Sequence, residues 1–445
     1  MVNLIPKSLI KLKNSKTLGK FAFSQIDIDI LKLSQASICN YAMTPLIGTI
    51  DTYWISRLKD PSILAGQGSA DRLFNSIYSI LSIAPSIITP LISKYHSVNN
   101  KEKMASVFSN TFFIVSSYSV VLTFFIFFKT NFLISTIIPN SSKSYLYACQ
   151  YFQLRSIGLI FSLLNSLAFS TMSGQKDLNT PIKINLISQL SNAILDPILM
   201  IFMGVRGVAL GTILSEFLGF ILFYSQIIKN NLINFKNKIR GVKKFFIEGI
   251  NIQIRSVSLS LIYLLASRKI QYIDKTDILS TTHIINSQLF EFGFIISYSY
   301  GKIPSILIPR YKNTRHIQNK IYKWGIVFSI FVSIIHIILG NYLSVLTTNQ
   351  MVLHKSKNII YIGSILQAIS TFTCINEGIS QSYEMFKILS FGSVISLTIF
   401  SISIINAKDL INIWIGFCIA SLSRTLVNYI CIKKFILKYK KWKNS

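Results

Sequence analysis

Long apolar runs are the feature that most restricts what this chain can fold into. Residues 104–128 contain no charged side chain, residues 324–353 contain none except one histidine, and residues 388–407 contain none. A helix of about 20 such residues crosses a hydrocarbon core of roughly 30 Å. The strands of a membrane barrel alternate apolar and polar residues, and these runs do not. The sequence therefore predicts an all-α integral membrane protein.

Polar loops divide the chain into twelve segments that could span a membrane. Six form an expected N-lobe over 33–228 and six an expected C-lobe over 247–432; basic tails lie at 1–32 and 433–445, and a basic inter-lobe loop at 229–246. Two equal halves are typical of secondary transporters. The segments are 33–56, 73–93, 106–128, 145–172, 182–204, 207–228, 247–267, 278–300, 324–348, 358–379, 386–407 and 410–432.

Basic residues outnumber acidic ones, 45 to 16, and give a formal net charge of +29. With the amino-terminal tail on the cytoplasmic-type side, the tails and even-numbered loops hold 29 of the 45 lysines and arginines, and the odd-numbered loops hold 11. This asymmetry predicts an even number of spans with both termini on the positive side. The charge lies in loops without an aromatic–basic recognition motif, so no nucleic-acid partner is expected.

The amino-terminal tail has no acid before Asp27, which leaves an organellar targeting role open beside a cytosolic tail. It lacks the apolar core and cleavage site of a secretory signal. The five cysteines form no CxxC pair, and the histidines, including His283 and His336 within spans, show no metal spacing. We therefore expect no disulfide framework, no metal site and no cofactor, apart from H⁺ or Na⁺ as a coupling ion.

Ionisable residues inside the expected spans are the candidates for function, because each costs roughly 2.5–3.5 kcal/mol on insertion scales. In "TPLIGTIDTYWI" an acid follows Pro45 by six residues, and in "SNAILDPILMIF" an acid directly precedes Pro197. The residues are Asp51, Arg155, Asp196, Glu216, Arg255, Glu291, Glu377 and Arg424.

Helical spacing groups the polar residues of the N-lobe. Asn192 and Asp196 are four apart and share a helix face, as do Thr212 and Glu216. A desolvated carboxyl group can bind a proton or a bare cation, and the two nearby prolines free backbone carbonyls and permit bending. We therefore expect these four residues and Asp51 to form the site that binds the coupling ion.

Each charged residue also has a structural interpretation. Asp51 could meet headgroup water at the end of its span, and Asp196 could be paired with an arginine. Glu216 fits a structural role about as well as a functional one. Intramembrane arginines are more often structural partners or snorkelling side chains than ligands. A second candidate set, for a substrate chamber, comprises Tyr151, Arg155, Arg255, Glu291 and Glu377.

One block of sequence resembles a known family. Residues 151–216, "YFQLRSIG…MSGQKDLNTPIKINLISQLSNAILDPILMIFMGVRGVALGTILSE", resemble the multidrug and toxic compound extrusion (MATE) family, with its polar loop after the fourth span and its Asn-x3-Asp-Pro helix. "TPLIGTIDTYWISRL" is similar to the family's first-span signature. "LSVLTTNQMVL" is similar to the segment after the ninth span, and "IWIGFCIASLSRTLVNY" to the twelfth span. The matching segments occur in order along the chain.

The resemblance implies two six-helix lobes in a V shape, with alternating access driven by inward movement of H⁺ or Na⁺. In the DinF-like, plastid-type branch, the N-lobe cation site matches Asp51, Asn192 and Asp196 here. Thr212 and Tyr151 also match polar positions of the family. A glutamate at position 216, where the family often has glutamine, adds an acid.

We therefore predict a secondary-active efflux antiporter for drugs or organic ions, and not an enzyme. An acidic chamber favours organic cations, whereas interior arginines favour carboxylates. The expected partners are this small substrate and the lipid bilayer, the expected oligomeric state is a monomer, and a plastid envelope is a candidate location.

Three alternatives remain open at this stage. A flippase for lipids or lipid-linked oligosaccharides, from the same superfamily, would have a cationic chamber, which Arg155 and Arg255 could supply. An intramembrane enzyme would need a cluster such as HExxH, and a channel would need a repeated filter motif. Neither motif occurs in the sequence.

Overall fold

The structure is a computed structural model that describes residues 24–41, 43–58, 60–175, 177, 179–233, 243–308, 314–383 and 385–444. Helices dominate these ranges, and no strand occurs within them. The elements are α2 Gln25–Tyr41, α3 Met43–Ser56, α4 Pro61–Leu81, α5 Ile83–Ser97, α6 Lys101–Phe128, α7 Thr130–Ser135, α8 Lys143–Gly174, α9 Asn179–Met203, α10 Val205–Lys229, α11 Lys243–Ile273, α12 Ile278–Gly301, α13 Ile303–Leu307, α14 Thr314–Gly340, η3 Leu343–Val345, α15 Gln350–Ser382, α16 Phe386–Ile405 and α17 Leu410–Asn444.

Nine of the described helices are long and apolar enough to cross a membrane. They are α6, α8, α9, α10, α11, α14, α15, α16 and α17. Three expected spans correspond to helices that are shorter or more polar: the first to α2 and α3, the second to α4 and α5, and the eighth to α12. The all-α membrane fold class is confirmed, and the count of twelve spans stays a prediction.

The structure corrects the second expected span, 73–93. Helix α4 begins at Pro61, where the carboxylate of Asp60 accepts a hydrogen bond from the backbone N–H of Ser62 and proline fits the first helical position. Residues 64–70 are rich in glycine, serine and glutamine, yet all are buried. Because this segment has low hydropathy, the expected span began only at residue 73. Asp71 and Arg72 precede that residue directly, and the structure places both within α4.

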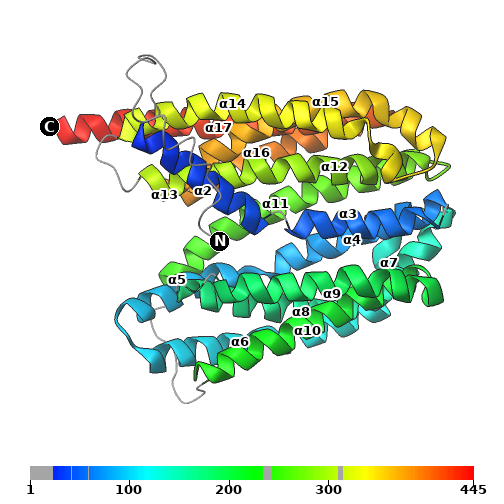
Figure 1. The fold of residues 1–445 in the computed structure, drawn as a ribbon, viewed down its shortest axis with the longest axis horizontal. Helices are drawn as coiled ribbons and strands as arrows, with labels where there is room; N and C mark the ends of the chain where they lie inside the picture. Colours follow the sequence, from blue (N-terminus) through cyan, green and yellow to red (C-terminus); the bar gives the residue numbers. More distant parts are fainter. Residues whose placement is uncertain are drawn as a thin grey trace, which may run out of the picture.

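The helices pack in two groups, with α3, α4 and α11 between them (Figure 1). We use N-lobe for α3–α10 and C-lobe for α11–α17. Helix α2 packs against α12, α13 and α14 of the C-lobe, although residues 33–41 belong to the expected N-lobe range. Half of the expected inter-lobe loop, residues 234–242, lies outside the described residues.

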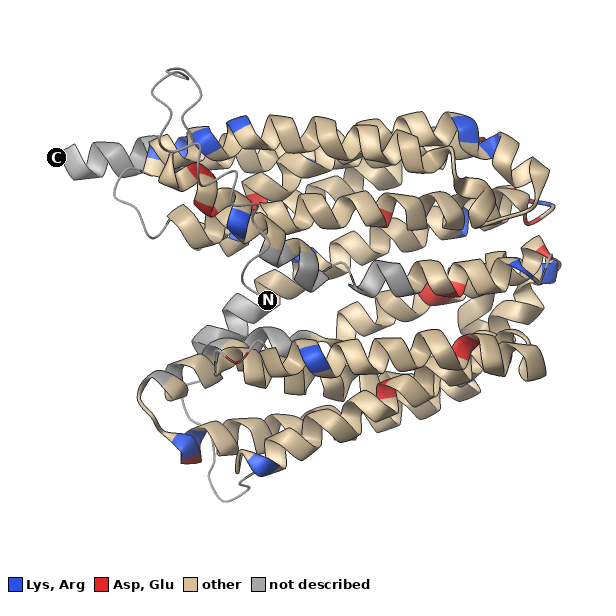
Figure 2. Cartoon of the chain, in the orientation of Figure 1, with Lys and Arg blue, Asp and Glu red and all other residues tan. Residues whose placement is uncertain are grey.

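The outer helix faces are apolar and the inner faces carry many polar groups. Phe113, Phe128 and Ile201 are among the large exposed side chains, and Phe202 is 79% exposed. Asn286 and Asp196 are fully buried. This distribution suits a bilayer, where lipid covers apolar side chains and polar groups must be satisfied inside the protein. Figure 2 shows acidic positions part-way along helices of both lobes, with basic positions mostly near helix ends.

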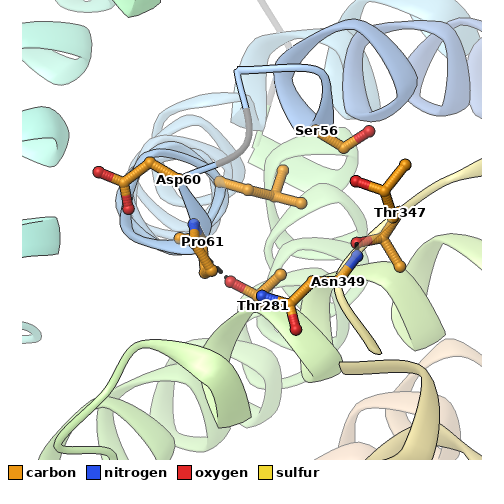
Figure 3. Close-up of a pocket in the computed structure, with 8 residues that line it drawn as sticks. Ser56, Asp60, Pro61, Thr281, Thr347 and Asn349 are labelled. Atoms are coloured by element: carbon orange, nitrogen blue, oxygen red, sulfur yellow. Dashed lines mark hydrogen bonds between the residues drawn. The ribbon is translucent and has the colours of Figure 1, made fainter. Parts of the chain in front are cut away.

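The lobes touch at the end of the molecule formed by odd-numbered loops. The Thr281 hydroxyl donates to the Pro61 carbonyl at 2.8 Å, and the Arg57 guanidinium donates to the Val345 carbonyl at 3.4 Å. Figure 3 shows a small pocket at this junction, lined from the N-lobe by Ser56, Asp60 and Pro61 and from the opposite side by Thr281, Thr347 and Asn349.

Further hydrogen bonds between the lobes continue toward the middle of the molecule. The Gln271 amide donates to the Ser69 hydroxyl at 2.8 Å, and the hydroxyls of Ser79 and Ser260 are 2.7 Å apart. The start of α2 and the end of α17 lie at the other end of the molecule (Figure 1). The side of the membrane on which these termini lie stays a prediction.

Candidate functional site

Two carboxyl groups meet inside the N-lobe. Asp51 on α3 and Asp196 on α9 lie within side-chain hydrogen-bonding reach of each other. Asn192, one turn before Asp196, donates its Nδ2 to Asp196 Oδ1 at 2.8 Å. In the described part of the chain, Asp51 Oδ1 and Asp196 Oδ2 are buried without a hydrogen-bond partner. Two ionised carboxylates in contact repel strongly at low dielectric, so this arrangement favours a proton or a cation between them.

The α9–α10 hairpin brings this site together. Gly204 joins the two helices with a backbone φ of 59°, which a residue with a side chain rarely adopts. Along α10, Gly211 packs against Asp196, and a Cβ atom at Gly211 would overlap Asp196 Oδ1. Pro197 lies inside α9 and cannot donate the helical hydrogen bond of its position. Thr212 was also expected at the ion site. Its hydroxyl donates to the Val208 carbonyl of its own helix at 3.0 Å.

Glu216, expected to belong to the ion site, forms an ion pair with Arg155. The guanidinium donates to both carboxylate oxygens, Nη1 to Oε2 at 3.0 Å and Nη2 to Oε1 at 2.7 Å. The Ser162 hydroxyl also donates to Oε1, at 2.8 Å. The Arg155 guanidinium lies 3.9 Å from the centre of the Phe74 ring. A bidentate pair of this kind fixes both side chains and neutralises both charges.

Asp71 on α4 is an interior acid that the sequence reasoning missed. The Tyr151 hydroxyl donates to Asp71 Oδ1 at 2.8 Å, and the Gln67 side-chain amide donates to Oδ2. Gln67 and Asp71 are four residues apart, the same spacing as Asn192 and Asp196. That shared amide–acid spacing was the signal that could have identified Asp71 before the helix was known.

The next residue, Arg72, points away from this cluster and toward the C-lobe. Its Nη2 lies 3.0 Å from Oε1 of Glu291 on α12, and its guanidinium lies 5.2 Å from the centre of the Tyr263 ring. Glu291 therefore forms an ion pair across the lobe interface. It also lines a small C-lobe pocket with aromatic walls, which include Tyr263, Phe290, Trp414 and Phe417.

The remaining charged candidates meet deep in the C-lobe. Glu377 Oε2 accepts a hydrogen bond from Arg255, and Glu377 Oε1 lies 3.5 Å from Nε of Arg424. One carboxylate therefore faces two guanidinium groups. The five expected chamber residues are distributed over the molecule: Tyr151 and Arg155 lie in the N-lobe, Arg255 and Glu377 in the C-lobe, and Glu291 between the lobes.

The two span histidines pack among aromatic rings of the C-lobe. The His283 ring stacks on Phe417 with centroids 6.2 Å apart, and His336 meets the edge of Phe290 at 6.5 Å. Both are buried. The aromatic neighbours of His283 and His336 fit the interpretation that both histidines are packed side chains.

Comparison with known proteins agrees with this architecture. Residues 36–198 match the family model described as MatE. Protein DETOXIFICATION 44, chloroplastic, from Arabidopsis thaliana is 22% identical over 214 residues, which cover 45% of this chain and 41% of that relative. The chain thus spans about two-fifths of the length of the curated relative that it matches.

Solved structures match over nearly the whole chain. An inward-facing multidrug resistance MATE family transporter of the MOP superfamily superposes with a TM-score of 0.76 at 15% identity, covering 91% of this chain and 99% of that one. A MOP superfamily transporter from Pyrococcus furiosus, described by the reverse polarity of its binding pocket, gives 0.73 at 15% identity, covering 92% and 96%.

These findings confirm the resemblance to the MATE family. The family and its structural neighbours are transporters and not enzymes. The chain is an integral, multi-pass membrane protein, and its fold is similar to that of MATE family transporters.

Proposed function

We propose that this protein is a secondary-active antiporter that exports small organic ions in exchange for H⁺ or Na⁺. The observation that carries the proposal is the contact between Asp51 and Asp196 inside the N-lobe. Within the described ranges neither carboxyl forms an ion pair with a basic side chain. Buried acids without a basic partner are what a reversible ion-loading site requires.

Loading the site would change how α3 and α9 pack. A proton shared by Asp51 and Asp196 lets the two carboxyl groups touch, whereas two ionised groups would separate or admit water. Pro197 lowers the cost of bending α9 at this point. Helix α3 packs on α9 and also on α12 of the C-lobe, so its movement would reach the lobe interface. A movement at the ion site would therefore be transmitted to the contact between the lobes, as alternating access requires.

The geometry favours H⁺ over Na⁺ as the coupling ion. Two carboxyl groups within hydrogen-bonding reach of each other can share one proton. Asn192 donates to Asp196 and thus presents a hydrogen atom to the site. A metal ion would need oxygen atoms turned toward it instead.

Transport in proteoliposomes tests the proposal. We expect an imposed pH gradient to drive accumulation of at least one fluorescent organic cation or carboxylate from a panel, and Asp196→Asn to abolish it. Glu102→Gln, which removes an exposed acid at the start of α6, is the control and should transport like the wild type. Wild-type transport by Asp196→Asn would contradict the mechanism, and dependence on a Na⁺ gradient alone would replace H⁺ by Na⁺.

A lipid or lipid-linked oligosaccharide flippase is the second candidate. The observation in its favour is the excess of positive charge around Glu377, where Arg255 and Arg424 share one carboxylate. Such a site could hold a phosphate or carboxylate group. Gradient-independent translocation of a fluorescent anionic lipid, lost in Arg424→Met, would support the flippase over the antiporter.

We propose a plastid envelope as the location, on the basis of the relative from Arabidopsis, which is named chloroplastic. A fluorescent fusion of the full chain, expressed in plant cells, should then outline the plastids. Fluorescence at the plasma membrane or vacuole would contradict this location.

A further inference from the structure

The interior of the N-lobe holds more acid than its ion pairs neutralise. In the part of the chain that the structure describes, Asp51, Asp71, Asp196 and Glu216 lie there, and Arg155 is the basic residue among them. Both donor arms of Arg155 are taken by Glu216. Three aspartates therefore remain without an ion-pair partner. A shared proton would satisfy the contact between Asp51 and Asp196 and would leave Asp71 without an ion-pair partner among the described residues.

Arg72, which follows Asp71 in the sequence, acts on Asp71 by its charge but forms its ion pair elsewhere. Its guanidinium pairs with Glu291 and lies over Tyr263, on the C-lobe side of α4. The charge of Arg72 is thus balanced across the lobe interface. Asp71 instead faces α8, where Tyr151 contacts it directly.

The partners of Asp71 suit both of its protonation states. A tyrosine hydroxyl can donate or accept a hydrogen bond, and a glutamine side chain can present either its amide or its carbonyl oxygen. Tyr151 and Gln67 could therefore hold a carboxylate or a carboxylic acid after small rotations. Glu216 differs, because a guanidinium can only donate. The contacts of Glu216 fix it as a carboxylate, and those of Asp71 do not.

The surroundings of Asp71 include charged groups from several elements. Arg155 on α8 and Arg72 on α4 are the opposite charges that act on it, and Glu216 on α10 opposes their effect. Asp51 and Asp196, on α3 and α9, both experience the field of Asp71. The unpartnered Oδ2 of the fully buried Asp196 shows that the neighbouring aspartate pair also has a hydrogen-bonding position left to fill.

We propose that Asp71 is a second proton-loading carboxyl of the N-lobe, separate from the Asp51–Asp196 pair. It takes a proton from water on one side of the membrane, as an O–H bond on its carboxylate, and returns the proton to water on the other side. The inference rests on the proposed antiport and deepens it. The N-lobe then carries two protons in a transport cycle, one on the aspartate pair and one on Asp71.

Infrared difference spectroscopy on the full chain in lipid nanodiscs tests this without a substrate. The spectrum recorded on raising the pH shows each carboxylic acid that loses its proton. We expect two such bands in the wild type. Asp71→Asn should lose one band and keep the band of the aspartate pair, whereas Asp196→Asn should keep the band of Asp71. Glu102→Gln is the control for an exposed acid and should leave both interior bands in place.

The Tyr151→Phe variant covers the case in which Asp71→Asn does not fold. It keeps the Asp71 carboxyl and removes the hydroxyl donor, so the Asp71 band should stay and change its frequency. The same pair of interior bands in wild type and Asp71→Asn, or no effect of Tyr151→Phe on either band, would overturn the proposal. Because the experiment measures protonation and not transport, two bands in a protein that fails to transport would reject the antiport and leave the assignment of Asp71 standing.

Discussion

The two lobes bury charged groups in opposite ways. In the N-lobe, Asp51 and Asp196 contact each other without a basic partner among the described residues. In the C-lobe, Glu377 faces the guanidinium groups of Arg255 and Arg424. The N-lobe site thus lacks positive charge, and the C-lobe site has an excess of it.

The hydrogen-bond partners explain why only one of these sites suits ion loading. Asn192, like Tyr151 and Gln67 near Asp71, carries groups that can donate or accept. The partners of Glu377 are arginines, which only donate and stay charged. A carboxyl held by arginines keeps its charge, so the C-lobe site is the structural one or binds an anion. The difference lies in the partners and not in the depth of burial.

The largest effect is expected for Glu377→Gln, which leaves Arg255 and Arg424 buried without their carboxylate. Removing one partner of a buried ion pair costs about 3–5 kcal/mol in the free energy of unfolding. Chemical denaturation in detergent micelles measures this cost. In the same assay Asp196→Asn should be far less harmful, because it removes an acid that has no basic partner. Equal destabilisation by the two variants would break the comparison between the lobes.

Gly211→Ala should have the next largest effect, and it acts on the N-lobe site alone. The added methyl group would overlap Asp196 Oδ1 and push that carboxyl away from Asp51. Overpacking of this kind costs about 1–3 kcal/mol in the free energy of unfolding, and gradient-driven transport should fall with it. Gly219→Ala on the same helix is the control. Its added methyl group would contact the side chains of Asn165 and Ser188, which are not part of the aspartate pair. Unchanged transport by Gly211→Ala would show that the contact is not needed.

A smaller effect is expected for Asp51→Asn. An asparagine can still donate to the Asp196 carboxyl, so the free energy of unfolding should stay within about 1 kcal/mol of the wild type. Gradient-driven transport should nevertheless be lost, because the pair can no longer share and release a proton. Thermal unfolding and proteoliposome transport on the same preparation separate the two outcomes. A large loss of stability would instead assign Asp51 a structural role.

The smallest effect concerns Asp27, where α2 docks on the C-lobe outside the expected spans. Burial alone would raise the pKa of Asp27, but hydrogen bonds from Lys320, Ser24 and Trp324 outweigh it and hold the pKa below the ordinary value of 3.8. A lowered pKa in the folded state stabilises the protein above the unfolded-state value, and this contribution is lost as the pH falls below it.

The side chains of this ion pair keep partial contact with solvent, 21% for Lys320 and 13% for Asp27, so we expect a contribution of about 1 kcal/mol or less. Comparing the unfolding of wild type and Asp27→Asn at neutral pH and near pH 3 measures it. The difference between the two proteins should be smaller near pH 3 than at neutral pH, because the contribution is lost progressively between the unfolded-state pKa and the lower folded-state pKa. A difference of the same size at both pH values would assign the effect to packing of α2 and not to the charge of Asp27.

The sequence was sufficient for the features that depend on neighbours along one helix. Apolar runs long enough to cross a bilayer predicted the membrane fold, and i, i+4 spacing placed Asn192 beside Asp196, where the structure has it. It failed for α4, because close packing through small residues such as Gly66 and Gly68 leaves a buried helix with low hydropathy. The acid at Asp71 was lost with that helix.

Which charges meet was decided only by the tertiary structure. The sequence identified Asp51, Glu216 and Arg155 as candidates without indicating which of them meet. The packing of α3, α8, α9 and α10 pairs the arginine with the glutamate and places Asp51 beside Asp196. Ionic contacts depend on atoms a few ångströms apart that come from distant segments, and one-dimensional patterns carry no such distances. Hydropathy and spacing therefore determined where the charges are buried, and the packing of the helices determined which of them are neutralised.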